Sequence, residues 1–332
     1  MDSRINWIDM AKGYGIIFVM IGHLYIPAIT PLIYTFHMPL FFFLSGYVFS
    51  TKSSIHIFIE RKIKRLIIPY ICLSIPLMIA NIFFQDDGDF CSSNIMNEIT
   101  SFIIQERHTT LWFIACLFMQ NLLLYPIAKY ASFRYQCILI FILCIVGVSL
   151  WRFSITALPW NFDVSLVAIP YFFIGYRMKT THKDSIIATT KKPIITTCVI
   201  ILCILGYGNY VYTGGRVDLF DSTYQIEPLV YLTAFIGIIV VLYISMKTDN
   251  HIIKYIGRNS LLFFAWHQAI VFPMITIIYK TLNIFQSNIF SERLYILNTL
   301  FRDFITILLA IIILYLCNEI LSNSKLKFVI GK

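Results

Sequence analysis

Charged side chains are scarce in this sequence: they make up 13% of its 332 residues, whereas 58% of the residues are hydrophobic and the mean hydropathy is +0.77. Soluble domains carry about 25% charged residues. Because the deficit extends along the whole chain, the excess apolar surface must face lipid rather than water. The composition therefore excludes an ordinary soluble domain and predicts a membrane protein.

The sequence signatures of several enzyme classes are also missing. It has no P-loop, no GxSxG turn, no HExxH helix and no dinucleotide-binding fingerprint. The eight cysteines form no CxxC pair and no Cys/His cluster, and all but Cys91 fall within apolar runs. We therefore expect neither a disulfide framework nor a metal site.

Ten apolar runs approach the length of about 20 residues that crosses a bilayer. No cleavable-signal pattern accompanies the first run, which we expect to be retained. The sequence thus predicts an all-α bundle of about ten transmembrane helices, forming one membrane domain over 1–332 without an appended soluble domain. The runs are 10–29, 31–50, 66–84, 111–131, 136–152, 164–178, 193–212, 228–246, 260–280 and 298–321.

The basic residues divide unevenly between the two sides of such a bundle. With the N-terminus inside, 20 of the 26 Lys and Arg residues fall on the inner side. This is the positive-inside pattern, and it places both termini in the cytoplasm. The net charge of +9 follows from this topology and gives no indication of nucleic-acid binding. The six outer basic residues are Arg107, Arg152, Arg216, Lys280, Arg293 and Arg302.

Two segments on the outer side, 85–110 and 213–227, connect predicted spans. Both are acidic or polar, and surface loops on a rigid scaffold often carry binding residues. They are candidates for recognition of an external substrate.

Two histidines interrupt the apolar runs, His23 in "VMIGHLYIP" and His37 in "FHMPLFFFLSG". Ionisable groups inside membrane spans are costly and usually functional. The loop between the two runs is very short, so their helices should be antiparallel neighbours with both imidazoles at about the same depth. Two imidazoles in this position can meet. The alternative is a structural role, in which each histidine only hydrogen-bonds between helices.

A polar stripe follows one side of the first helix. Asp9, Lys12 and His23 fall within about 60° of one another, and the stripe should face the bundle interior. His23 lies about 21 Å beyond Asp9 at a rise of about 1.5 Å per residue. We therefore expect Asp9 to pair with Lys12 or with an Arg of a neighbouring helix rather than with His23.

Further polar residues gather near the predicted cytoplasmic ends of two other helices. Arg61, Lys62, Lys64 and Arg65 precede the third run. They are either a positive-inside anchor or a site for a polyanionic cytosolic donor, because Arg binds phosphates through paired hydrogen bonds. His267 lies about two turns into the ninth run and is either a pore-lining donor or a packing residue.

Five segments together resemble a known family. They occur in the order and spacing seen in acyltransferase family 3, and more narrowly in its fucose 4-O-acetylase-like and intercellular-adhesin-type branch. The resemblance covers nearly the whole chain and implies about ten transmembrane helices in a bacterial inner membrane. It also implies transfer of an acyl group, usually acetyl from acetyl-CoA, to cell-surface glycans or their lipid-linked precursors. The segments are "RINWIDMAKGYGIIFVMIGH", "FHMPLFFFLSGY", "RLIIPY", "LWFIACLF" and "IGRNSLLFFAWH".

The resemblance also suggests roles for single residues. The family's first-helix histidine corresponds to His23, its basic positions after the second helix correspond to Arg61 and Arg65, and many members have Arg in place of Lys12. We expect catalysis by His23 and His37, and donor phosphate binding by Arg61, Arg65 and Lys12. The remaining candidates for functional roles are Asp9, His267 and Arg258.

Two other classes of function stay open on the sequence. A transporter or glycan exporter would also place His and Arg inside a bundle, although related halves or matched broken helices are then common. A non-catalytic subunit of a polysaccharide synthesis complex would keep the fold and could lose the histidines. Release of the free CoA thiol would distinguish an enzyme from a carrier. The oligomeric state is not predicted.

Overall fold

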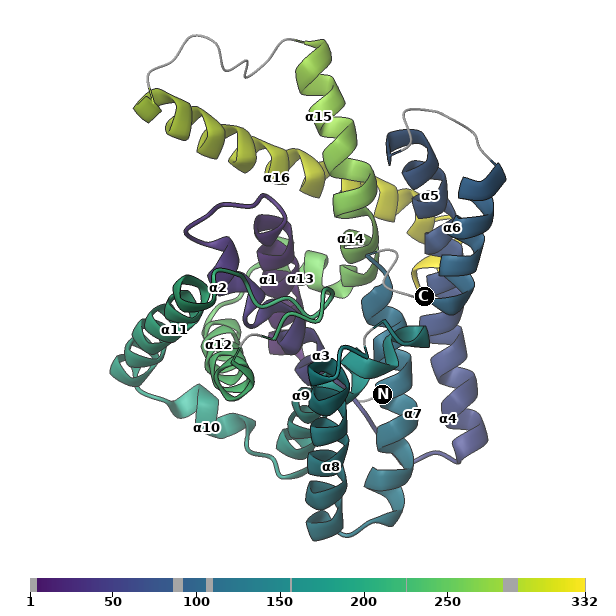
Figure 1. Cartoon of the computed structure of the whole chain (residues 1–332), viewed down its shortest axis with the longest axis vertical. Coiled ribbons are helices and arrows are strands. Elements are labelled where there is room, and N and C mark those ends of the chain that lie inside the picture. The colour runs from purple at the N-terminus through teal and green to yellow at the C-terminus, as the bar shows by residue number, and fades with distance from the viewer. Residues whose placement is uncertain are drawn as a thin grey trace.

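The computed structural model describes residues 5–85, 92–105, 110–155, 157–224, 226–282 and 292–331. Over these ranges the chain is a helix bundle (Figure 1), and the all-α prediction is confirmed for them. The helices are α1 (Asn6–Gly22), α2 (Thr30–Tyr34), α3 (His37–Tyr47), α4 (Ile55–Lys62), α5 (Ile68–Gln85), α6 (Ser92–Ile104), α7 (Trp112–Tyr130), α8 (Phe133–Arg152), α9 (Phe162–Thr180), α10 (Asp184–Thr189), α11 (Lys192–Thr213), α12 (Glu227–Lys247), α13 (His251–Arg258), α14 (Ser260–Trp266), α15 (Phe272–Thr281) and α16 (Glu292–Ser322).

Two π-helical segments join pairs of these helices. The segment η1 (Ile63–Ile67) connects α4 to α5, and η3 (His267–Val271) connects α14 to α15. Such segments widen the helix by one residue and are found frequently at functional sites. Both coincide with residues that the sequence singles out, Arg65 in η1 and His267 in η3.

Six helical segments in the described part of the chain are long and apolar enough to cross a membrane. They coincide with six of the ten predicted spans. Five belong to single helices, α7, α8, α11, α12 and α16, and the sixth runs from Ser260 to Thr281 through α14, η3 and α15.

The other four predicted runs are helical as well: α9 covers 164–178 without a break, and 66–84 begins in η1 and continues through α5, but the first two runs are less regular. The first helix ends at Gly22, seven residues before the predicted end of its span. The second run is broken between α2 and α3, where Phe36 has φ −134°. Pro39 explains this break, because it has no N–H to donate to the carbonyl of Thr35 and its ring would clash with that carbonyl in a continuous helix.

Helical structure also fills segments that the sequence leaves as loops. α6 lies within the predicted outer segment 85–110, of which 86–91 and 106–109 fall outside the described residues. The short helices α4, α10 and α13 lie in predicted inner segments. Runs of apolar residues reveal membrane spans, but they do not reveal short helices that carry many polar side chains.

The first helices lie in the middle of the bundle (Figure 1). α1 contacts α3, α12, α13 and α14, and α3 packs along α9. The phenylalanine run of α3 belongs to this core. Phe41 and Phe42 both pack against Phe113 of α7, with ring centroids 6.0 and 4.7 Å away, and Phe113 in turn contacts Phe264 of α14.

A pair of glycines brings α3 and α9 into backbone contact. A Cβ atom at Gly46 would lie 1.9 Å from the carbonyl oxygen of Phe172, and one at Gly175 would lie 2.0 Å from that of Phe43. Membrane helices associate through such close packing of small residues, because burial of apolar surface gives little gain in lipid. The two glycines therefore set the distance between α3 and α9.

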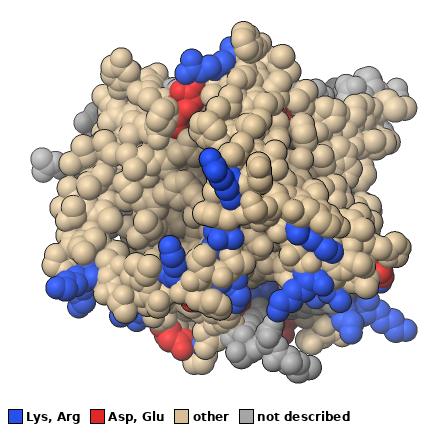
Figure 2. Space-filling view, turned by 90° about the horizontal axis from the view of Figure 1, so that it is seen from below, with Lys and Arg blue, Asp and Glu red and all other residues tan. Residues whose placement is uncertain are grey.

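One face of the bundle is basic. Figure 2 shows the face seen from below in Figure 1, with Lys and Arg spread across it and few Asp or Glu. The turn between α7 and α8 and the helix α10, both in predicted inner segments, lie toward this end (Figure 1). One of the six predicted outer basic residues, Arg107, lies outside the described residues.

Candidate functional site

His23 caps the end of α1 that is opposite to Asp9. It follows the last helical residue, Gly22, and its Nδ1 atom lies 2.8 Å from the carbonyl oxygen of Val19. The side chain is half-buried. Because α1 is unbroken up to Gly22, the rise of about 21 Å from Asp9 to His23 that the sequence predicts applies.

The imidazole in contact with His23 is that of His267. Nε2 of His267 lies 3.5 Å from Nδ1 of His23, and the ring centroids are 5.0 Å apart with the rings at 75°. His267 is the first residue of η3 and is 1% exposed. The two residues are 244 positions apart in the sequence, so only the packing of α14 beside α1 brings them together.

His37 reaches the same group of rings through Tyr34. The Tyr34 ring centroid lies 6.1 Å from that of His23 and 4.7 Å from that of His37. His37 is 3% exposed. The phenol ring of Tyr34 therefore packs against both His23 and His37, and the imidazole in contact with His23 is that of His267, where the sequence suggested that of His37.

Hydrogen bonding assigns the protons of all three histidines. In each ring Nδ1 lies 2.8 to 3.0 Å from the carbonyl oxygen of the residue four positions earlier. A carbonyl oxygen only accepts, so Nδ1 carries the proton, and in the neutral ring Nε2 carries the lone pair. His267 can then accept from His23 through Nε2. His23 is the most exposed of the three histidines, so its Nε2 is the basic atom that a substrate can reach.

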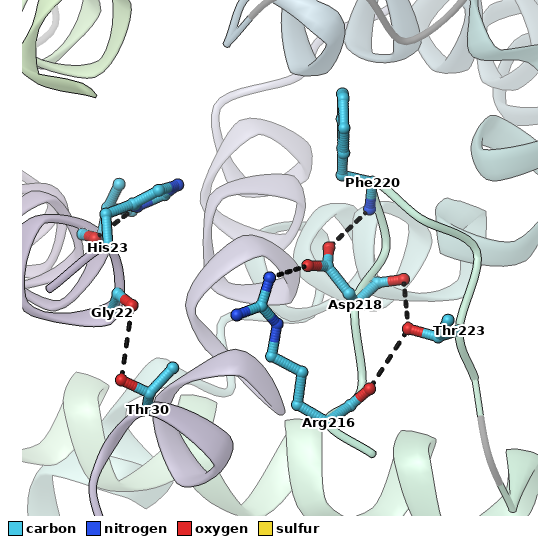
Figure 3. A network of polar contacts seen from close by, with 8 residues as sticks. Gly22, His23, Thr30, Arg216, Asp218, Phe220 and Thr223 are labelled. Atoms are coloured by element: carbon cyan, nitrogen blue, oxygen red, sulfur yellow. Dashed lines mark hydrogen bonds and ion pairs between the residues drawn. The ribbon is translucent and has the colours of Figure 1, made fainter. Parts of the chain in front are cut away.

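An arginine from a distant loop completes the group. The guanidinium of Arg216 lies 4.2 Å from the Tyr34 ring centroid and 5.2 Å from that of Tyr25. Nη2 of Arg216 donates to Oδ2 of Asp218 at 3.1 Å. Figure 3 shows this pair beside the end of α1 that carries His23. Burial raises the pKa of the Asp218 carboxyl above its usual range.

Asp9 forms an ion pair at the opposite end of α1. Nε of Arg258, in α13, lies 3.0 Å from Oδ2 of Asp9, whose side chain is 7% exposed. The prediction that Asp9 pairs with an Arg of a neighbouring helix is confirmed. The helices meet closely here, since a Cβ atom at Gly257 would lie 1.8 Å from the Asp9 carbonyl oxygen. Lys12 is half-buried one turn further along α1.

The predicted donor-binding arginines lie on α4 and η1. Arg61 and Arg65 are both exposed. Between them, Lys64 pairs with Glu60 at 2.6 Å, and Nζ of Lys62 lies 5.3 Å from the ring centroid of Phe58. These basic residues form a cluster of their own, separate in its contacts from the histidine group. In the part of the chain that the structure describes, no group of three or more His, Cys, Asp or Glu is arranged to hold a metal ion.

Tyr34 and Arg216 are the residues of this site that the sequence reasoning missed. Tyr34 lies three positions before His37, which would suggest a shared face in a regular helix, but the chain is broken between them. Arg216 is one of few basic residues on the predicted outer side, and this is the sequence feature that could have marked it as a candidate. Nothing in the sequence indicates that it stacks on Tyr34.

Comparison with known proteins agrees with this picture. The model of a family described as an acyltransferase domain matches residues 5–319, a range that includes every residue of the site. No curated protein and no solved structure matched the chain. The chain therefore belongs to acyltransferase family 3, and its apolar helices are those of a multi-pass membrane acyltransferase.

Proposed function

We propose that the protein transfers an acetyl group from acetyl-CoA to a hydroxyl of a cell-surface polysaccharide or its lipid-linked precursor. The observation that carries the proposal is the partly accessible His23, whose Nε2 lone pair is oriented by His267 in a chain of an acyltransferase family. The fucose 4-O-acetylase-like and intercellular-adhesin-type branch is the part of the family that the sequence segments favour.

The proposed setting is a bacterial inner membrane, which the chain crosses about ten times with both termini in the cytoplasm. The uneven division of Lys and Arg supports this orientation, as does the basic face in Figure 2. Asp9 and Arg258 then lie at the cytoplasmic end of α1 and His23 lies toward the outer side. In this arrangement α1 connects the donor's compartment with that of the acceptor.

The chemistry assigned to His23 is general base catalysis. Nε2 takes the proton of the acceptor hydroxyl as its oxygen forms a bond to the thioester carbonyl carbon, and the C–S bond then breaks. The proton passes from His23 to the CoA thiolate, so that an ester and free CoA result. The same lone pair would be the nucleophile in a two-step route through an acyl-imidazole.

The neighbouring rings support this role in different ways. The Val19 carbonyl oxygen and Nε2 of His267 both lie against Nδ1 of His23, which keeps the proton on Nδ1 and the lone pair on Nε2. His37 is held by the Ile33 carbonyl and packs on Tyr34, which makes it a positioning residue for the phenol ring beside His23. A group held in place by packing and hydrogen bonds loses little freedom when the substrate binds.

The donor's phosphates are assigned to Arg61 and Arg65, with Lys12 nearer the bundle interior. Both arginines are exposed on the predicted cytoplasmic side, where an anionic nucleotide can reach them. The fork of a guanidinium group suits phosphate oxygens. Asp9 and Arg258 tie α1 to α13 at this end and thereby position Lys12.

The test of the function compares surface polysaccharide from the native host by NMR. Deletion of the gene should remove O-acetyl signals, and complementation with the wild-type gene should restore them. An unchanged acetyl content together with reduced polysaccharide export would contradict the proposal and favour a transporter. Purified protein with acetyl-CoA and an acceptor should also release free CoA thiol, which a carrier would not do.

Removal of Arg61 and Arg65 should weaken the binding of acetyl-CoA more than it slows the transfer step. We expect the double variant Arg61→Gln/Arg65→Gln to raise KM for acetyl-CoA about tenfold, the size of about 1.4 kcal/mol of lost binding, with a smaller change in kcat. The matched control is Lys191→Gln/Lys192→Gln, which removes two exposed charges from another inner segment. Equal changes in KM for the two double variants would show that only the general surface charge matters.

A further inference from the structure

The segment between α11 and α12, residues 214–226, has no role in the transfer step described above. It belongs to the predicted outer side, and it carries Arg216 and Asp218 to the histidine group. Two questions decide its function: whether this loop holds Arg216 in a defined place, and what kind of group a cation in that place would bind.

The loop is held rigidly. Asp218 and Thr223 form a small antiparallel bridge, with backbone N–H to O distances of 2.9 and 2.8 Å, and the Asp218 carboxylate accepts from the N–H of Phe220 at 2.9 Å. Apolar side chains on both sides of this turn are buried in the bundle: Val217, Leu219 and Tyr224 are 3%, 4% and 1% exposed. Packing and hydrogen bonds of this kind hold the polar side chains of the loop in place.

The anchored loop places Arg216 against the ring of Tyr34, and this ring lies beside His23, the proposed general base. The Tyr34 ring that the guanidinium covers at 4.2 Å is the same ring that lies beside His23 and His37. Arg216 is also close enough to both histidines to interact with them electrostatically. A substrate with its hydroxyl at Nε2 of His23 therefore has this cation within reach of an adjacent substituent.

The exposure of the pair shows which partner is accessible. The Arg216 side chain is 27% exposed and that of Asp218 is 10% exposed, so the carboxylate side is covered more completely than the arginine. A guanidinium oriented by a buried carboxylate and an aromatic ring presents fixed N–H donors, which match the paired oxygens of a carboxylate or phosphate. A neutral sugar would use such a fixed charge poorly.

We propose that Arg216 binds an anionic group, a carboxylate or a phosphate, that lies next to the reacting hydroxyl of the acceptor. The acceptor would then be an acidic glycan, such as one containing a uronic acid, or a glycan joined to a phosphate. The inference rests on the proposed function for the statement that the bound anion belongs to the acceptor. It makes Arg216 a residue that determines acceptor specificity, with no part in the proton transfer.

Binding of three small glycosides tests the inference on the full chain in lipid nanodiscs. The probes are methyl β-D-glucoside, methyl β-D-glucuronide and glucose 1-phosphate, which differ in the presence and kind of anion. By calorimetry, the wild type should bind at least one charged probe about tenfold more tightly than the glucoside. The charged probe that binds more tightly distinguishes a carboxylate from a phosphate as the natural group.

Variants then assign this preference to Arg216. Arg216→Gln should abolish the preference, whereas Arg216→Lys, which keeps the charge without the fork, should retain part of it. The matched control is Arg152→Gln, because Arg152 is another arginine on the predicted outer side that pairs with a carboxylate, that of Glu227, at 2.7 Å. If Arg216→Gln proves unstable, the affinity of Arg216→Lys for the charged probes decides, since full wild-type preference in that variant would contradict recognition by the guanidinium fork.

The outcomes separate this inference from the proposed function. No anion preference in the wild type, a preference that survives Arg216→Gln, or an equal loss in Arg152→Gln would each overturn the role of Arg216. CoA release from acetyl-CoA in the same samples reports on acyl transfer independently. CoA release without anion preference would support the acyltransferase function and contradict the anion site at Arg216. Anion binding that depends on Arg216, without any CoA release, would support the anion site and contradict the acyltransferase function.

Discussion

Replacement of His23 by alanine is expected to lower the rate of acyl transfer by about 10²- to 10⁴-fold, the usual contribution of a general base. The loss should appear in kcat, because the Nε2 lone pair of His23 acts on the hydroxyl during bond formation, whereas acetyl-CoA is expected to bind elsewhere. CoA release by the purified variant measures the effect in vitro, and O-acetyl NMR of the complemented deletion strain measures it in the cell.

The matched control for this experiment is His251→Ala. His251 is an exposed histidine in the first turn of α13, away from the ring group. It should retain wild-type activity at equal abundance in the membrane. Full activity of His23→Ala at wild-type abundance would contradict the mechanism, and loss of activity in both variants would show that the assay reports on folding. Variants of His267 should lose less than His23→Ala, because His267 only positions the base.

The second large effect is expected on stability, from a single added methyl group between α3 and α9. Gly46→Ala places a Cβ atom 1.9 Å from the Phe172 carbonyl oxygen, whereas ordinary contacts begin at 3.4 Å. The two backbones must separate, although the reciprocal contact at Gly175 holds them together. Overpacking of a core costs about 1–3 kcal/mol and occasionally more. We therefore expect a lower Tm and a smaller yield of monodisperse protein in detergent.

Gly208→Ala is the control for this substitution. Gly208 lies in α11, and a Cβ atom there would meet nothing within 4 Å. Alanine is the better helix former by roughly 0.5–1 kcal/mol, so this change should leave Tm unchanged or raise it. The fraction of protein that stays monodisperse after heating, measured for both variants, provides the comparison. A Gly46→Ala protein as stable as Gly208→Ala would mean that α3 and α9 can move apart freely.

Much of the architecture could be predicted from the sequence because bilayer insertion acts on local composition. An apolar run of the right length predicts a helix wherever it occurs, and six of the predicted runs are structural helices long enough to span a membrane. The stripe on the first helix was equally local, since Asp9 and His23 are related by helical geometry alone. The break before His37 was less predictable, because the effect of Pro39 depends on where the chain turns.

The sequence by itself determined that this chain is an apolar helix bundle, that it carries the segments of its family, and that His23 and Asp9 stand at opposite ends of one helix. Only the tertiary structure decided which residues gather around His23. His267 lies 244 positions away and Arg216 comes from a loop between distant helices, while Tyr34 is brought in by the short helix α2. The physical reason is that hydropathy and periodicity act within one helix, whereas these contacts depend on which helices pack together and on the rotation of each about its axis.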